Sequence, residues 1–299
     1  MKPIIVLGIC LFLFTSNVLA ERPLPLLVST AWLSDHLNDA DLVVLHVGYS
    51  RPEYREAGHI PGARFLWYNW LVISTPDLST ELPPLTQADT VLESLGITFS
   101  SKIVLCFTGT NIIAATRILL TLSYFGFQDQ VALLDGGFDA WKAAQKPISK
   151  EQPLFKRTSL TLTPHPEFVV DAAYVQSHLR SAGCSVVDAR ARNFYDGKAG
   201  GIVRAGHVAG AKSIPYSAII DSTIKMKDIT TLKKLFDDEG IKEGGTIVTY
   251  CHSGGQATLV QFAARLLGYK TSLYDGSFDD WSWKDETYSV EKTELPMKK

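Results

Sequence analysis

Short apolar runs alternate with amphipathic stretches along most of this chain. The runs are four to six residues long and rich in β-branched residues, as expected of strands buried on both faces of a parallel sheet. The stretches between them repeat apolar residues every three or four positions, which predicts helices. Ser29 or Thr30, and Asp171, are expected to cap the first helices. The predicted strands are LVVLHV (42–47), IVLCF (103–107), VALL (131–134), SVVD (185–188), IVTY (247–250) and TSLY (271–274).

The pattern occurs twice in the same order. Matching residues stay between 140 and 148 positions apart, so the two halves differ only by small insertions. Each half reads as helix, strand, loop, short strand, helix, strand, helix and strand. The sequence therefore predicts an α/β fold of two tandem domains, each a parallel sheet flanked by helices on both faces. The matching segments are 28–47 with 169–190, GHIPGA (58–63) with GHVAGA (206–211), 94–105 with 238–249, and LLDGGFDAW (133–141) with LYDGSFDDW (273–281).

The first residues of the chain differ from the rest. Lys2 precedes an unbroken apolar run over 4–14, and the following TSNVLA (15–20) ends in small residues at positions −3 and −1 of a cleavage site after Ala20. This pattern is typical of a secretory signal peptide and is too short for a membrane span. We therefore expect a periplasmic or secreted protein with no membrane attachment after removal of the leader. The predicted divisions are a signal peptide at 1–20, an N-terminal domain at 21–147, a linker at 148–166 and a C-terminal domain at 167–299.

Composition and charge exclude some classes of function. The 299 residues carry a formal net charge of −2, which offers no electrostatic footprint for nucleic acid. His59 and His207 recur in both halves without a second ligand at a metal spacing. We expect no metal, no other cofactor and a monomeric protein.

Three cysteines remain after the leader, namely Cys106, Cys184 and Cys251. An odd number in an oxidising compartment leaves at least one thiol unpaired. A bridge between Cys106 and Cys184 stays an open alternative. A free thiol in an exported protein favours chemistry at one of the three residues.

Cys251 has the most distinctive surroundings. It follows the predicted strand IVTY, and the loop HSGGQA leads from it into a helix predicted over 257–268. Gly254 and Gly255 allow backbone angles that turn N–H groups toward the sulfur, and the helix adds its positive end. We therefore expect the pKa of the Cys251 thiol to be lowered.

The alternative is that Cys251 is a small buried residue in a tight turn. The duplication bears on this alternative, because the first half has Phe107 at the equivalent position. The turn therefore does not require a cysteine for its shape, which favours a chemical role for Cys251.

The duplication, the GHIPGA and GHVAGA segments, VDAR (187–190), the Cys251 loop and DGSFDDW (275–281) together resemble the rhodanese sulfurtransferases. The resemblance covers nearly the whole chain after the leader, and that family also has an active second domain and a first domain without the cysteine. It implies a ping-pong reaction through a persulfide on Cys251. The implied partners are a small-molecule sulfur donor, thiosulfate or 3-mercaptopyruvate, and cyanide or a thiol as acceptor.

Two other readings of the loop compete with this one. Relatives of the fold that act on phosphate or arsenate need an arginine six residues after the cysteine, where this chain has Ala257 and its nearest helix arginine is Arg265. A phosphatase is therefore not favoured. A non-catalytic rhodanese pair that carries persulfide or recognises a partner is the competing hypothesis.

The choice of donor rests on the residues after the cysteine. In the family, thiosulfate enzymes carry cations there, whereas mercaptopyruvate enzymes carry CGSGxxA. The sequence CHSGGQA (251–257) shares a serine, a glycine and an alanine with the second type, and the charge of His252 depends on pH. However, the Asp and His that follow GHIPGA in mercaptopyruvate enzymes are missing, because 64–84 contains Asp77 and no histidine. We expect thiosulfate, with 3-mercaptopyruvate as the alternative.

The family's substrate arginine has no counterpart, because Asn193 stands at its usual place. Arg192 is the expected anion-binding residue, ahead of Arg204 and Lys198, and Arg190 is expected to pair locally as a structural residue. The predicted site has Cys251 as the nucleophile and, as substrate-binding residues, Arg192, His252, Ser253, Gly254, Gly255, Gln256 and Ala257.

Overall fold

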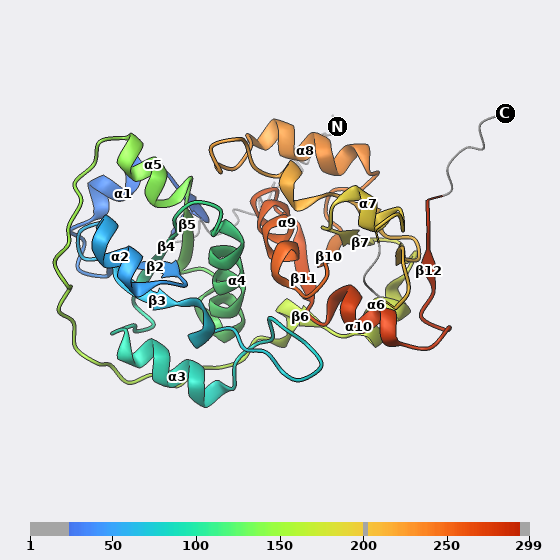
Figure 1. Ribbon diagram of the computed structural model, residues 1–299, viewed down its shortest axis with the longest axis horizontal. Coiled ribbons are helices and arrows are strands. Elements are labelled where there is room, and N and C mark those ends of the chain that lie inside the picture. Colours follow the sequence, from blue (N-terminus) through green and yellow to red (C-terminus); the bar gives the residue numbers. More distant parts are fainter. Residues whose placement is uncertain (1–23, 200–202, 294–299) are drawn as a thin grey trace, which may run out of the picture.

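The computed structural model describes residues 24–199 and 203–293, which form two α/β halves packed side by side (Figure 1). The signal peptide predicted at 1–20 lies outside the described residues. The elements of the first half are β1 (Leu27–Val28), α1 (Thr30–His36), β2 (Leu42–Gly48), α2 (Arg51–Ala57), β3 (Arg64–Trp67), α3 (Leu85–Ser94), β4 (Lys102–Cys106), α4 (Ile112–Leu122), β5 (Val131–Leu134) and α5 (Gly137–Ala143). Those of the second half are β6 (Val169–Val170), α6 (Ala172–His178), β7 (Cys184–Asp188), α7 (Arg192–Tyr195), β8 (His207–Val208), β9 (Lys212–Ser213), α8 (Ile229–Asp238), β10 (Thr246–Tyr250), α9 (Gly255–Leu266), β11 (Lys270–Tyr274), α10 (Ser277–Trp283) and β12 (Val290–Glu291).

Each half is built on a five-stranded parallel sheet, and the two strand orders match. The orders are β1-β5-β4-β2-β3 and β6-β11-β10-β7-β9. The central registers also correspond, since His46 lies opposite Cys106 in the first sheet and Asp188 lies opposite Tyr250 in the second. The duplication and the predicted fold class are therefore confirmed.

Helices cover both faces of each sheet, as the continuous apolar runs predict. In β2, Val43 and Leu45 face α3 and α4, whereas Val44 faces α1 and α5 on the opposite side. In the second half, α8 and α9 cover the inner face, while α6 and α10 cover the outer one. The inner faces of the two sheets share one continuous apolar core.

Helices α4 and α9 meet at the centre of the molecule (Figure 1). The Oγ1 atoms of Thr116 and Thr258, which are equivalent residues of the two halves, are 2.8 Å apart. Arg265 donates from Nη1 to Oγ of its own equivalent, Ser123, at 3.0 Å. Because equivalent residues contact each other, the two halves are related by an approximate two-fold axis between α4 and α9.

The local predictions hold for the strands and the first helices, with two differences. Ser29 and Asp171 cap α1 and α6 by accepting backbone N–H bonds. The stretch after β2, predicted as a loop, forms α2, because Ser50 caps it in the same way. Helix α9 begins at Gly255, two residues before the predicted start, so Gln256 and Ala257 lie in its first turn.

The segment predicted as a linker, 148–166, is called the strap here. It runs along the outside of the first half before entering the second (Figure 1). Arg157 of the strap donates from Nη2 to Glu93 of α3 at 2.9 Å, and Leu162 is buried. These contacts tie the strap to α3 of the first half. None of the helices in the described residues is long and apolar enough to cross a membrane.

Candidate active site

Cys251 lies directly after β10, at the carboxyl edge of the second sheet. Ligand sites in open parallel sheets form at this edge. The residue is only 2% exposed and belongs to the core that both halves share. Its carbonyl oxygen accepts the N–H of Phe278 at 3.0 Å, and that of Phe107 accepts the N–H of Phe138 at 2.7 Å. The equivalence of Phe107 and Cys251 inferred from the duplication is confirmed.

The loop after Cys251 forms a cradle of backbone N–H groups around the sulfur. Four of them act on the thiol, from Ala257, Ser253, Gly254 and Gln256. Two of the four belong to the first turn of α9, whose free N–H groups add the positive end of a helix. Such a ring of donors suits a sulfur anion, either a thiolate or a persulfide.

The two glycines of the loop have different roles. Gly254 has a φ of +89°, and a Cβ there would lie 2.8 Å from Oδ1 of Asp275. This position therefore requires glycine. Gly255, predicted to share that role, is instead the first residue of α9 and lies outside the left-handed region.

The predicted lowering of the Cys251 pKa is wrong for the free site. Burial raises the pKa of the Cys251 thiol above its ordinary value of 9.0, although the four cradle N–H groups act in the opposite direction. The loss of hydration at a 2% exposed sulfur outweighs the N–H groups. The resting site therefore holds a protonated thiol at neutral pH.

This direction predicts the pH dependence of thiol reactivity. Only the thiolate is alkylated, so the rate of Cys251 modification by iodoacetamide should rise with pH and reach half its maximum above pH 9.0. Mass spectrometry of the peptide containing Cys251 over a pH series measures this rate. A half-maximal rate below pH 9.0 would show that the cradle dominates over burial.

Ser277 supports the cysteine from behind and was not singled out in the sequence. It is fully buried and has a φ of +53°, which is costly for a residue other than glycine. Its Oγ accepts the N–H of Cys251 at 3.2 Å and donates to the carbonyl of Tyr274 at 2.9 Å. The equivalent residue of the first half is Gly137, with a φ of +58°. A serine in place of glycine in DGSF, compared with DGGF, is the signal that could have identified it.

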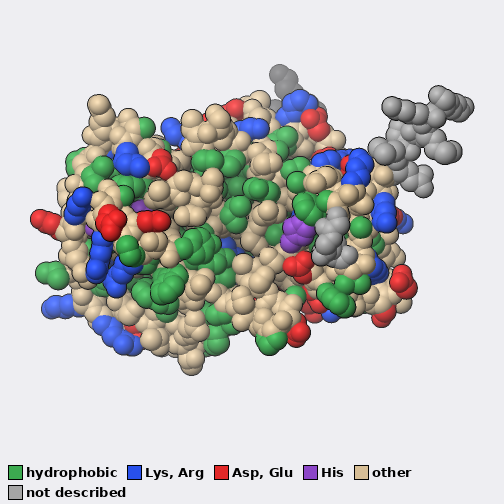
Figure 2. Space-filling view, in the orientation of Figure 1, with side chains coloured by type: hydrophobic (Ala, Val, Ile, Leu, Met, Phe, Trp, Pro, Cys, Tyr) green, Lys and Arg blue, Asp and Glu red, His purple; other side chains and the backbone are tan. Residues whose placement is uncertain are grey.

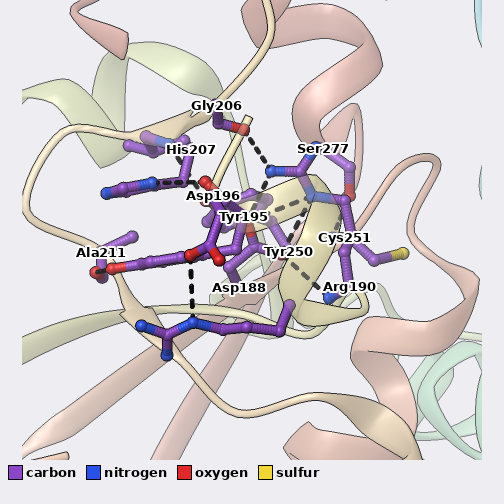
Figure 3. A network of polar contacts seen from close by, with 12 residues as sticks. Asp188, Arg190, Tyr195, Asp196, Gly206, His207, Ala211, Tyr250, Cys251 and Ser277 are labelled. Carbon is purple, nitrogen blue, oxygen red and sulfur yellow. Dashed lines mark hydrogen bonds and ion pairs between the residues drawn. The ribbon is translucent and has the colours of Figure 1, made fainter. Parts of the chain in front are cut away.

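A buried polar network holds the strand ends beside Cys251 (Figure 3). Arg190 donates from Nε and Nη2 to the Asp188 carboxylate, at 3.0 and 2.6 Å to its two oxygens, and from Nη2 to the carbonyl of Gly206 at 2.6 Å. Tyr250 donates its hydroxyl to the same carboxylate at 2.8 Å. The structure thus shows the expected local pairing of Arg190. Its Nη1 has no hydrogen-bond partner among the described residues.

The other predicted cations bind groups other than the cysteine loop. Arg192 is half exposed and donates from Nε to Oδ1 of Asp196 at 3.1 Å, and Lys198 binds the same carboxylate at 2.7 Å. Arg204 donates to backbone carbonyl groups, including that of Trp281 at 2.6 Å. The donor-binding role of Arg192 stays a prediction. By contrast, Arg190 is close enough to Cys251 for an electrostatic interaction between the two once the thiol is ionised.

His252 is held at the mouth of the loop. Its ring packs edge-on against Phe194, with 4.5 Å between the ring centroids. Burial and the charge of Arg190 lower the pKa of His252 below its ordinary value of 6.5, although Asp188 acts in the opposite direction. His252 is therefore neutral at pH 7, and the loop presents no cationic side chain next to the nucleophile.

The first half contributes directly to the cysteine loop. Arg117 of α4 is fully buried and forms a bidentate ion pair with Asp275, in which Nη2 lies 3.0 Å from Oδ2. A Cβ on Gly254 would lie 3.2 Å from Nη1 of Arg117, so the ion pair supports the loop at its left-handed residue. Thr80 donates its hydroxyl to the carbonyl oxygen of Ser253. Neither contact is visible in the sequence, because both join residues more than 150 positions apart.

The three described cysteines are free thiols, so the alternative of a Cys106–Cys184 bridge is not realised. Burial raises the pKa of the Cys106 thiol well above its ordinary value, and burial also raises that of Cys184. Among the residues that the structure describes, no group of three His, Cys, Asp or Glu side chains is placed to hold a metal ion.

Comparisons with known proteins agree with this arrangement. The family model of the rhodanese-like domain matches residues 29–144 and 171–284. The thiosulfate sulfurtransferase of Azotobacter vinelandii is 28% identical over 265 residues, covering 88% of this chain and 96% of the relative. The "Probable 3-mercaptopyruvate sulfurtransferase" of Pseudomonas aeruginosa is 29% identical over 277 residues, covering 85% and 94%. The crystal structure of SseA from Escherichia coli, described with the rhodanese fold of 3-mercaptopyruvate sulfotransferases, superimposes with a TM-score of 0.74 at 24% identity, covering 87% of this chain and 99% of SseA.

Proposed function

Because this chain belongs to the rhodanese family, we propose that it transfers the sulfane sulfur of thiosulfate to cyanide or a thiol through a persulfide on Cys251. Its activity class is that of a sulfurtransferase, the class to which its curated relatives belong. The observation that carries the proposal is the cradle of four backbone N–H groups around a free, otherwise buried thiol. Such donors stabilise the negative charge of the persulfide intermediate.

In the first step, Cys251 loses its proton to solvent and its sulfur attacks the outer sulfur of thiosulfate. A new S–S bond forms to Cys251, the S–S bond of thiosulfate breaks, and sulfite leaves with the bonding electron pair. Because Nη1 of Arg190 has no partner among the described residues and its charge reaches Cys251, Arg190 is the cation available to the departing anion. Arg192 is the other candidate for this role.

In the second step, cyanide or a thiolate attacks the terminal sulfur of the persulfide. The S–S bond breaks, thiocyanate or a new persulfide leaves, and the electron pair returns to Cys251 as a thiolate held by the cradle. Cys251 is only 2% exposed, so we expect small donors and acceptors to reach its sulfur most easily.

Two observations bear on the choice of donor. Thr80 of the first half contacts the cysteine loop at Ser253. The segment that contains Thr80, 64–84, has no histidine that would form the Asp–His pair typical of mercaptopyruvate enzymes. This supports thiosulfate. The neutral His252 and the shared Ser253, Gly254 and Ala257 favour 3-mercaptopyruvate as the second candidate donor.

Steady-state assays with both donors test this choice. The purified protein is incubated with cyanide and either donor, and thiocyanate is measured together with sulfite or pyruvate as the second product. We expect kcat/KM for thiosulfate to exceed that for 3-mercaptopyruvate by about tenfold or more. The opposite ratio would make 3-mercaptopyruvate the donor. If neither donor gave thiocyanate, the protein would instead be a non-catalytic persulfide carrier or binding module.

The cellular location follows from the leader pattern and belongs to the proposal. The apolar run after Lys2 and the small residues up to Ala20 support export to the periplasm or the medium. Thiosulfate, an inorganic ion, suits such a location better than an intracellular metabolite. Cleavage after Ala20, read by N-terminal sequencing of the exported protein, checks this point.

A further inference from the structure

A cavity of about 300 Å³ lies in the first half, apart from the cysteine loop. Three separate parts of the chain line it with cations, namely Arg51 and Arg55 from α2, Arg64 from the start of β3, and Lys150 from the strap. No aspartate or glutamate lines it, and neither does any residue of the second half. In Figure 2, several Lys and Arg side chains lie at the left end of the molecule, where Figure 1 places α2, with Asp and Glu side chains among them.

These cations have no ion-pair partner in the part of the chain that the structure describes. Arg64 donates from Nη1 to the carbonyl oxygens of Leu95 and Gly96, and its guanidinium lies 4.5 Å from the ring centroid of Phe155. Lys233 of α8, by contrast, is paired with Asp237 at 3.1 Å. Four unpaired cations around one cavity create a positive potential that favours an anion.

Helix α2 places one of its two arginines against ordinary helix electrostatics. Arg51 is the first residue of α2, where the helix dipole disfavours a cation. Arg55 follows four residues later on the same face, and like charges at this spacing repel each other. The acidic residues of the helix, Glu53 and Glu56, do not line the cavity. The dipole favours Arg55, which lies in the last turn of α2, but it gives no reason for Arg51, and an anion between the two arginines would stabilise both.

Aromatic rings form the rest of the wall. Tyr54, Phe65 and Phe155 line the cavity beside the cations. Its volume is near the lower end of the range for small-molecule sites. A ligand that fits both the charge and the rings is therefore small, multiply anionic and partly apolar.

We propose that this cavity is a second binding site, specific for a compact organic anion that carries at least two phosphate or carboxylate groups. The charged groups lie against Arg51, Arg55, Arg64 and Lys150, and the body of the ligand lies against Tyr54 and Phe155. The site does not depend on the sulfur-transfer reaction, because no residue of the cysteine loop contributes to it.

Calorimetric titration of the whole protein with fructose 1,6-bisphosphate and, separately, with citrate tests the proposal and distinguishes phosphate from carboxylate ligands. We expect saturable binding of at least one of them at one site. The double variant Arg51→Gln/Arg55→Gln should weaken that binding by at least about tenfold. Its melting temperature should be unchanged or raised, because a repulsive pair is removed, and sulfur transfer by Cys251 should be unchanged without the ligand.

The matched control is Lys233→Gln/Lys234→Gln on the exposed face of α8, which removes the same charge from paired lysines. It should leave binding unchanged. No saturable binding of either anion up to about 10 mM would overturn the proposal. An equal loss in both double variants would also overturn it, because the affinity would then follow net charge and not the cavity.

Discussion

Replacing Cys251 by serine is expected to abolish sulfur transfer. A serine hydroxyl does not attack a sulfane sulfur at neutral pH and does not form a persulfide, so both steps of the reaction lose their nucleophile. The fold should survive, because serine is close in size and the first half builds the same turn with Phe107. We expect the rate of thiocyanate formation to fall by at least about a thousandfold.

The control for this variant is the same change at Cys184. That thiol is partly exposed at the start of β7, and burial raises its pKa. Cys184→Ser should keep at least half of the wild-type rate. If Cys251→Ser stayed active while Cys184→Ser lost activity, the assignment of the nucleophile would be wrong.

The second large effect is expected at Arg117, which lies outside the catalytic half. Arg117→Met leaves the Asp275 carboxylate buried without its cation, which costs about 3–5 kcal/mol when one partner of a buried ion pair is removed. Gly254 lies against this ion pair, so the cradle should also lose its geometry. Urea unfolding should show the loss of stability, and kcat for sulfur transfer should fall in the fraction that remains folded.

Two further variants separate positioning from general stability. Thr116→Val removes the hydrogen bond between the Thr116 and Thr258 hydroxyls, which joins the two halves next to Arg117. It leaves the cysteine loop untouched, so it should lower the free energy of unfolding by only about 1 kcal/mol and leave kcat unchanged. Arg117→Lys keeps the charge without the bidentate geometry and should recover only part of the rate. A folded Arg117→Met protein with an unchanged kcat would contradict the positioning role.

The sequence predicts the architecture well, for physical reasons that are local. A strand buried on both faces must be continuously apolar, so runs such as IVTY (247–250) locate their strands to within a residue or two. The comparison of the halves then shows that Phe107 and Cys251 occupy one structural position. Local caps such as Ser29 and Asp171 are equally readable, because each acts within three residues.

Features that depend on tertiary contacts could not be predicted in the same way. The ion pair of Arg117 and Asp275 joins residues 158 positions apart, and nothing near either residue indicates it. The pKa of Cys251 depends on a balance between burial and N–H groups, and only the structure gives the burial. The loop alone shows the groups that lower the pKa, which explains why the sequence suggests a lowered value.

The arrangement of cations shows the same limit. Spacing along the chain favours Arg192, but α7 directs it to Asp196 at the surface. Arg190, expected to pair locally, does so with Asp188, and its charge also interacts with the sulfur of Cys251. The sequence therefore favours Arg192 as the anion-binding residue, whereas the electrostatic interaction with Cys251 favours Arg190.

The most direct test of the persulfide reaction is the mass of the protein after incubation with thiosulfate. We predict an added mass of about 32 Da on the peptide containing Cys251, corresponding to one sulfur atom. Cyanide should remove this mass and release an equal amount of thiocyanate. A Cys251 peptide that stays unmodified by thiosulfate, or an adduct that cyanide does not remove, would contradict the proposed transfer of thiosulfate sulfur through Cys251.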